Sequence, residues 1–201
     1  MKIKTGLILS AGFGKRVQPI TDNLPKPLIV YKNQTLLENT INFLIKLKID
    51  KIKINVFYLK EKIVSFIEDK NFPANIEIVD DGETILGTGG GILSLINRSD
   101  EDDVLVINPD TIWDESYLNS ISAMEKIYFE KQIKNILLVV NNSSCFDKRF
   151  NGDFEIKNNI LFKEKINNLK YTGCQIFNKD IISHKQLNYF PISEIWDTLL
   201  R

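Results

Sequence analysis

Short apolar runs alternate with amphipathic segments along the first two thirds of the chain. Runs of apolar and β-branched residues predict buried strands at 5–10, 51–59, 75–81, 103–110 and 135–140. Apolar residues that recur at helical spacing predict helices over 36–47, 60–69 and 115–129. This alternation is typical of an α/β fold with a doubly wound, mostly parallel sheet and right-handed crossover connections.

The pattern changes after residue 141. Short strands separated by Asn-rich turns predict a small antiparallel addition, and 190–200 is predicted to be a closing helix. We therefore expect one domain over 1–201, with a core over 1–140 and the addition over 141–201.

Composition narrows the class of protein. The chain has 201 residues, of which 26 are basic and 26 acidic, so its formal net charge is zero. That balance argues against a broad nucleic-acid-binding face but permits a local cationic pocket. The sequence has neither a signal-peptide pattern nor an apolar stretch long enough to cross a membrane. We expect a cytoplasmic protein that is a monomer or a small homo-oligomer.

The segment 7–28 is the candidate phosphate site. Its apolar strand is followed by two glycines and three cations, Gly12, Gly14, Lys15, Arg16 and Lys26. A flexible cationic loop after a buried strand is how α/β proteins bind phosphate. The segment lacks the third glycine of a dinucleotide fingerprint and the Gly-Lys-Ser/Thr of a Walker A loop. Prolines on both sides of Lys26 favour an extended, preorganised lysine.

Three parts of this segment are distinctive, namely Leu9-Ser10-Ala11-Gly12-Phe13-Gly14-Lys15-Arg16, Pro19-Ile20-Thr21 and Pro25-Lys26-Pro27-Leu28. Together they resemble the signature of sugar-1-phosphate nucleotidylyltransferases. The resemblance continues through 87–92, 108–110, 151–156 and 171–177. Within the family it is strongest to N-acetylmuramate-1-phosphate uridylyltransferases and to mannose- or heptose-phosphate enzymes. It implies a Rossmann-like fold of the nucleotide-diphospho-sugar transferase type and a nucleotidyltransferase activity.

The resemblance implies roles for the residues of the nucleotide site. Arg16 would hold the triphosphate and the departing pyrophosphate, while Lys26 would lie over the α-phosphate, where negative charge concentrates in the transition state. The other implied nucleotide-binding residues are Ser10, Ala11, Gly12, Gly14, Lys15, Gly87, Gly89 and Gly90. The later glycines would lie in a loop that leads into a helix; a turn that binds nothing is the alternative reading.

Asp110 is the candidate Mg²⁺ ligand and the third catalytic residue. It ends the predicted strand 103–110 beside the nucleotide loops, where a metal ion would bridge phosphates. A helix N-cap before 112–116 is the alternative role for this carboxylate.

Members of the family have a second magnesium aspartate, in a segment resembling Trp-x-Asp-x-Gly-Thr. Trp196-Asp197 lies in a predicted helix and is followed by Thr-Leu-Leu, so it does not match that segment. We expect a chain truncated at its C-terminus. An enzyme with one protein carboxylate, or a catalytically weak one, is the alternative.

The antiparallel addition is expected to bind the sugar. By resemblance, the sugar contacts are Asn108, Gly152, Asp153, Thr172 and Glu164. Glu164 with Lys165 would supply a hydroxyl acceptor and a phosphate contact, but the spacing to Thr172 is shorter than we expect. An exposed charge pair in a turn is the alternative for Glu164 and Lys165.

The implied reaction needs no general base. An oxygen of a sugar 1-phosphate, already an anion, attacks the α-phosphorus of a nucleoside triphosphate, and pyrophosphate leaves in line. We expect UTP and N-acetylmuramate 1-phosphate as substrates and Mg²⁺ as cofactor, which would place the enzyme in the recycling of peptidoglycan sugars. Mannose-1-phosphate guanylyl transfer, transfer to another phosphorylated acceptor, and non-catalytic binding of nucleotide sugars are the alternatives.

Overall fold

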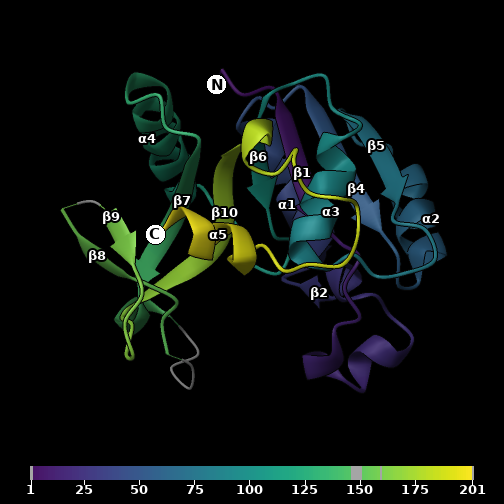
Figure 1. The fold of residues 1–201 in the computed structure, drawn as a ribbon. Helices are drawn as coiled ribbons and strands as arrows, with labels where there is room; N and C mark the ends of the chain where they lie inside the picture. Colours follow the sequence, from purple (N-terminus) through teal and green to yellow (C-terminus); the bar gives the residue numbers. More distant parts are fainter. Residues whose placement is uncertain (1, 146–150, 159, 201) are drawn as a thin grey trace.

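Six strands form the central sheet of the computed structural model (Figure 1), which describes residues 2–145, 151–158 and 160–200. In sheet order they are β5 (Asn75–Asp80), β4 (Lys51–Val56), β1 (Thr5–Leu9), β6 (Asp103–Ile107), β10 (Leu169–Asn178) and β7 (Asn135–Asn141). The first four are parallel to one another, whereas β10 is antiparallel to both β6 and β7. The predicted mostly parallel α/β sheet is confirmed.

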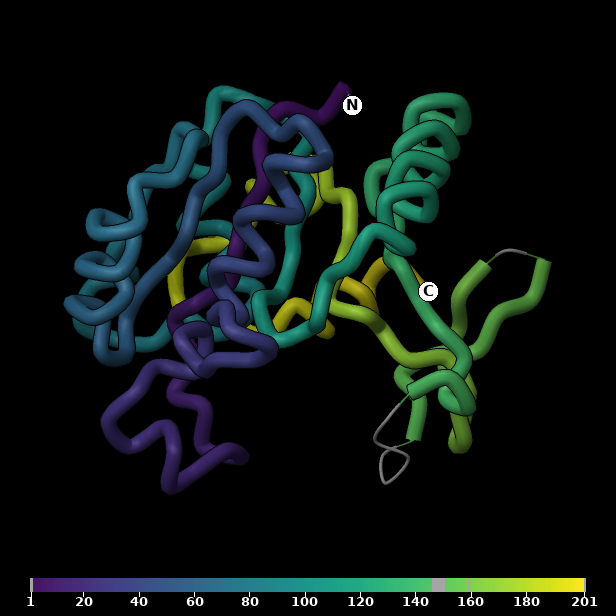
Figure 2. The backbone as a smooth tube through the Cα atoms, turned by 180° about the vertical axis from the view of Figure 1, so that it is seen from behind, coloured from purple at the N-terminus to yellow at the C-terminus, as the bar shows by residue number. Residues whose placement is uncertain are grey.

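Helices cover both faces of this sheet (Figures 1 and 2). One face carries α1 (Leu36–Lys46), α2 (Lys60–Lys70) and α4 (Ser116–Glu130), and the other carries α3 (Gly87–Ile96) and α5 (Ser193–Leu199). Neighbouring strand residues enter different cores: Leu105 packs under α1, and Val106 packs under α3. Burial on both faces explains why the central strands β1 and β6 are nearly continuous apolar runs.

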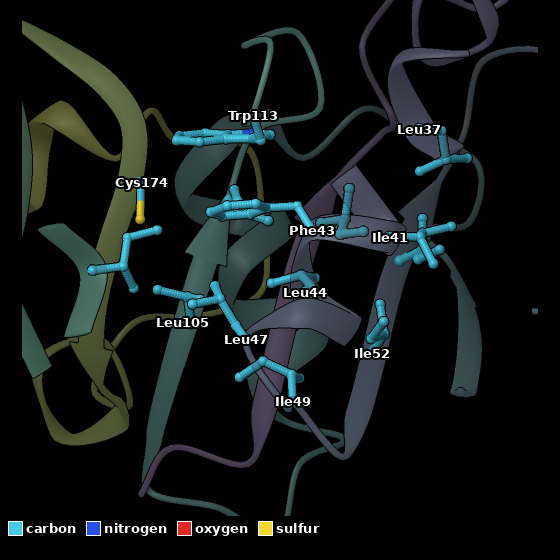
Figure 3. Close-up of a cluster of buried hydrophobic side chains, with 14 of the residues drawn as sticks. Leu37, Ile41, Phe43, Leu44, Leu47, Ile49, Ile52, Leu105, Trp113 and Cys174 are labelled. Atoms are coloured by element: carbon cyan, nitrogen blue, oxygen red, sulfur yellow. The ribbon is translucent and has the colours of Figure 1, made fainter. Parts of the chain in front are cut away.

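Trp113 anchors the segment that follows β6. Figure 3 shows its ring stacked on that of Phe43 in α1, and the ring centroids are 5.6 Å apart. The indole Nε1 donates to the carbonyl of Asn108 at 2.9 Å, and the backbone N of Trp113 donates to Asn39 Oδ1 at 2.9 Å. The turn that carries Asp110 is therefore fixed at both ends to a buried aromatic residue.

Two short hairpins lie outside the central sheet. They pair β2 (Val30–Tyr31) with β3 (Gln34–Thr35), and β8 (Glu155–Lys157) with β9 (Ile160–Phe162). The antiparallel direction predicted after residue 141 is confirmed, but β10 lies inside the central sheet rather than beside it. Among the described residues, no helix is long and apolar enough to cross a membrane.

The helix predicted after the glycine loop is present, but the glycines themselves belong to it, because they form the first turns of α3. They allow the segment 188–190 to cross the helix at close range. The amides of Gly89 and Gly90 donate to the carbonyl of Phe190 at 2.9 and 3.3 Å. A Cβ atom on Gly90 would lie 2.3 Å from the carbonyl oxygen of Asn188.

Gly90→Ala is therefore expected to destabilise the protein. In an open helix alanine is favoured over glycine by about 1 kcal/mol, but the backbone clash here should cost about 1–3 kcal/mol. Thermal unfolding measures the difference. Gly12→Ala is the control, since a Cβ there meets nothing within 4 Å. A melting temperature of Gly90→Ala at or above that of the wild type would contradict the observed approach.

Candidate active site

A cavity of about 520 Å³ lies at the carboxyl ends of β1 and β6. It is enclosed by the loop after β1, by the first turn of α3, by residues 108–110 and by Tyr189 and Pro191. Most of the predicted site residues line it: Ser10, Ala11, Gly12, Gly14, Lys15, Arg16, Lys26, Gly87, Asn108 and Asp110. The structure thus brings together the three predicted catalytic side chains, from segments far apart in the sequence.

The loop after β1 is held in place by contacts around Gly14. This glycine has a φ of 66°, and a Cβ atom would lie 2.8 Å from Thr21 Cγ2, so both conformation and space require glycine. Thr21 Oγ1 donates to the Gly14 carbonyl at 3.0 Å, and the Tyr58 hydroxyl donates to the Thr21 carbonyl at 2.9 Å. These bonds preorganise the loop that presents Lys15 and Arg16.

The two cations after Gly14 remain available to a ligand. Within residues 2–145, 151–158 and 160–200, neither Lys15 nor Arg16 forms an ion pair, although Lys15 Nζ lies 5.4 Å from the centroid of the Phe13 ring. Both line the cavity. Cations without a protein counter-charge attract a polyanion strongly, because no existing pair has to be broken.

Lys26 is preorganised, as expected, but its backbone is not extended. It begins a 3-10 helix over Lys26–Leu28, closed by a 2.8 Å bond from the Leu28 N to the Pro25 carbonyl. The tight turn overrides the extended preference that Pro27 imposes on the residue before it. The ammonium group points to the carboxylate of Asp110 and forms an ion pair with it.

Asp110 is the one carboxylate that lines the cavity among the described residues. It does not cap a helix, because α4 begins at Ser116 with Glu115 as its N-cap residue. The described part of the chain has no cluster of three or more His, Cys, Asp or Glu side chains suited to a metal ion. A single carboxylate still fits Mg²⁺, which is often held by one or two carboxylates together with substrate phosphates.

A buried polar pair behind the loop escaped sequence analysis. Asn55 of β4 accepts from the Ser10 amide at 2.9 Å and donates to Asp81 Oδ2 at 2.7 Å. Asn55 is only 2% exposed and lines the cavity wall. Its signal was an amide within the otherwise apolar end of a predicted strand. Burial raises the pKa of Asp81, whose Oδ1 has no hydrogen-bond partner among the described residues.

Asp81→Asn is expected to change the pH dependence of stability. Because its pKa is raised in the folded state, Asp81 favours folding below its unfolded pKa of about 3.9 and loses that contribution as pH rises through the folded pKa. The melting temperature of the variant relative to the wild type should therefore increase from acidic to neutral pH. A difference that is constant across this range would argue against a buried, proton-binding carboxyl group.

The remaining predicted residues lie away from the cavity. Gly89 and Gly90 pack against 188–190, as described above. The carboxylate of Asp153 accepts from the Tyr171 amide at 2.8 Å, and Thr172 Oγ1 donates to the Leu138 carbonyl at 2.9 Å. A Cβ on Gly152 would lie 2.7 Å from the carbonyl oxygens of Asn167 and Leu169, and Glu164 is exposed. Sugar binding by these last four residues stays a prediction.

Comparison with known proteins gives the family. The profile of the nucleotidyl transferase family matches residues 5–150, a span that holds the whole first loop and Asp110. The chain belongs to this family. As a nucleotidyl transferase it is an enzyme, and the predicted resemblance is confirmed.

Relatives with curated names agree with this assignment. The nucleotidyl transferase is 25% identical to the N-acetylmuramate alpha-1-phosphate uridylyltransferase of Caulobacter vibrioides, over 98% of this chain and 84% of that protein. It is 37% identical to the bifunctional protein GlmU of Methanocaldococcus jannaschii over 64% of this chain, but spans only 30% of that relative. The inositol-1-phosphate CTP transferase of T. maritima has the same fold, with a TM-score of 0.81 at 16% identity over 98% of this chain and 80% of that one.

Proposed function

We propose that this nucleotidyl transferase couples UTP to N-acetylmuramate 1-phosphate, forming the uridine diphosphate sugar and pyrophosphate. The observation that carries the proposal is the convergence of Arg16, Lys26 and Asp110 on one cavity. The choice of acceptor and base draws support from the relative in Caulobacter vibrioides, because that similarity extends over 98% of this chain.

Two polyanions must meet in this reaction, and the cavity is equipped to bind them. Lys15 and Arg16 lie on one wall, where they neutralise the triphosphate and the pyrophosphate that leaves. The backbone of Ala11 and Gly12 is free of bulky side chains, so the nucleoside fits closely against it. Lys26, in the 3-10 turn that follows, lines the same cavity as Lys15 and Arg16. Its ammonium group stabilises the charge that builds on the α-phosphate.

The reaction forms one P–O bond and breaks another. A phosphate oxygen of the sugar 1-phosphate bonds to the α-phosphorus, and the bond to the β-phosphate bridging oxygen breaks with both electrons leaving on pyrophosphate. Asp110 and the substrate phosphates would hold Mg²⁺, which supplies further charge neutralisation when bound. In this structure Lys26 forms an ion pair with Asp110; with Asp110 engaged by Mg²⁺, the Lys26 ammonium would be available to the phosphate.

Pyrophosphate release tests the proposal. The full chain is incubated with each of UTP, GTP, CTP and dTTP against a panel of sugar 1-phosphates, with Mg²⁺ present. We expect the highest kcat/KM for UTP with N-acetylmuramate 1-phosphate. Faster turnover of another pair would support the same enzyme class but show that UTP and N-acetylmuramate 1-phosphate are not the preferred substrates. Nucleotide binding without turnover of any pair would instead favour a binding protein that has kept the cavity.

Guanylyl transfer is the second candidate. It draws support from the D-glycero-alpha-D-manno-heptose 1-phosphate guanylyltransferase of Aneurinibacillus thermoaerophilus, which is 31% identical over 53% of this chain and 46% of that protein. The same panel separates the two candidates, because GTP with a mannose- or heptose-type 1-phosphate would then give the faster release.

A further inference from the structure

A smaller pocket of about 240 Å³ adjoins the active-site cavity on the side of α3 and α5. We call it the side pocket. Leu9, Thr88 and Asn108 line both spaces, so the two pockets are neighbours. Its other lining residues are Ile92, Tyr171, Gln175, Ile192, Ser193 and Trp196. Because Asn108 lies two residues before Asp110, the side pocket begins close to the place where the acceptor phosphate reacts.

Gln175 is the most buried of the polar residues that line this pocket. The residue is 1% exposed, and its Oε1 accepts a 3.1 Å hydrogen bond from the indole Nε1 of Trp196. Trp196 is held in turn by edge-to-face contacts with Tyr171 and Phe154, at centroid distances of 4.9 and 5.6 Å. Since the indole donates only to an oxygen, this bond fixes which end of the Gln175 amide is the nitrogen.

The nitrogen end of that amide has no hydrogen-bond partner in the described part of the chain. The nitrogen is not among the fully buried side-chain atoms that lack a partner, and Gln175 lines the pocket, so this donor is open to a molecule there. The orientation of Gln175 is thus well determined, while half of its hydrogen-bonding capacity is left for a molecule in the pocket. A ligand with a carbonyl oxygen would satisfy it.

The chemistry of the walls selects the kind of group. None of the nine lining residues is charged, and most are apolar or aromatic. A carboxylate or phosphate would lose its hydration there without gaining a cation, which is strongly unfavourable. A small neutral acyl group has the opposite character, because its methyl contacts the apolar walls and its carbonyl accepts one hydrogen bond.

We propose that the side pocket receives the acylamino substituent of the sugar 1-phosphate, with Gln175 Nε2 donating to its carbonyl oxygen. This inference rests on the proposed function and specifies the acceptor further. The enzyme selects N-acylated sugar 1-phosphates, and Gln175 recognises the acyl group by a hydrogen bond to its carbonyl oxygen. Trp196 acts as a positioning residue, because it holds the Gln175 amide in the required orientation.

A matched pair of acceptors tests the proposal. N-acetylglucosamine 1-phosphate and glucose 1-phosphate differ only in the acylamino group, and kcat/KM is measured for each with UTP. The acylated acceptor alone offers an acceptor to Gln175, so we expect a preference of about 10- to 100-fold for it, which corresponds to about 1.4–2.8 kcal/mol. Equal values for the two acceptors, or a preference for glucose 1-phosphate, would overturn the assignment.

Gln175→Met provides the matched variant, since it keeps the length of the side chain and removes its donor. We expect the variant to lose about 10- to 100-fold in kcat/KM with the acylated acceptor only. Gln175→Glu is a second variant that keeps the acceptor for Trp196. Equal losses with both acceptors would mean that Gln175 only supports the fold, and unchanged selectivity in both variants would move recognition elsewhere.

A binding measurement separates this inference from the proposed function. Of the two tryptophans, Trp196 borders the side pocket and Trp113 is buried under α1. Quenching of tryptophan fluorescence by N-acetylglucosamine 1-phosphate, compared with glucose 1-phosphate, therefore reports on the pocket without turnover. Turnover of no pair in the wild type would refute the proposed function. Tighter binding of the acylated compound, lost in Gln175→Met, would still support the side pocket, and equal affinities would refute it.

Discussion

Lys26→Ala is expected to lower kcat by about 10²–10³-fold, the usual effect of removing one preorganised charge from a transition state. The stability should hardly change. The ion pair of Lys26 with Asp110 is partly exposed, with 28% and 37% of the two side chains accessible, and such pairs contribute at most about 1 kcal/mol. Steady-state kinetics and thermal unfolding of the same preparation measure both effects.

The control for this variant is Lys134→Ala. Lys134 also forms an ion pair, at 2.7 Å with Asp180, but it lies outside the cavity. Its removal should leave kcat unchanged. If Lys26→Ala kept normal turnover, or if both variants lost activity equally, Lys26 would not be the residue that stabilises the α-phosphate.

Asp110→Asn should have an effect of similar size on turnover and a second effect on magnesium. The asparagine keeps the shape of the side chain but loses the charge that a hard divalent cation prefers. We expect a loss of about 10²–10³-fold in kcat and a higher Mg²⁺ concentration for half-maximal rate. Binding of Mn²⁺ to the nucleotide-bound protein, followed by paramagnetic resonance, gives a readout that does not depend on activity.

Asp114→Asn is the matched control for the metal. Asp114 lies in the same connection between β6 and α4, and its Oδ1 accepts from the Ser116 amide at 2.9 Å. The side-chain oxygen of an asparagine accepts the same hydrogen bond, so folding should be preserved. Unaltered magnesium dependence in Asp110→Asn, or altered dependence in Asp114→Asn, would place the cation away from Asp110.

The part of the cavity formed by the loop after β1 and by Asp110 was largely predictable from sequence. The loop after β1 carries its information in adjacent residues: a glycine, Gly14, where φ is positive, cations after it, and prolines around Lys26. Asp110 followed from its place at the carboxyl end of a strand, and parallel strands bring such ends to the same edge. Patterns of this kind can be recognised from sequence because neighbouring residues determine the conformation of the loop, and tertiary contacts only stabilise it.

The side pocket was less predictable because it depends on packing between distant segments. Gln175 lies on the same face of β10 as Tyr171, and Trp196 reaches it from α5. Nothing in the spacing of these residues along the sequence predicts the contact between Gln175 and Trp196. The helical glycines were predicted to form a loop for a related reason. Glycine is needed there because the segment 188–190, about a hundred residues later in the chain, leaves no room for a Cβ atom.

The place of β10 between β6 and β7 has a consequence for how the chain folds. Its pairing partners lie earlier in the sequence, with Asn178 opposite Asp103 and Leu169 opposite Asn141. During synthesis, the outer edge of β6 and the whole of β7 therefore lack the backbone hydrogen bonds that β10 supplies, until residues 169–178 leave the ribosome. Late contacts between distant segments slow folding, and open apolar edges attract other chains. Aggregation of nascent chains should be greatest for lengths that include β7 but stop short of β10.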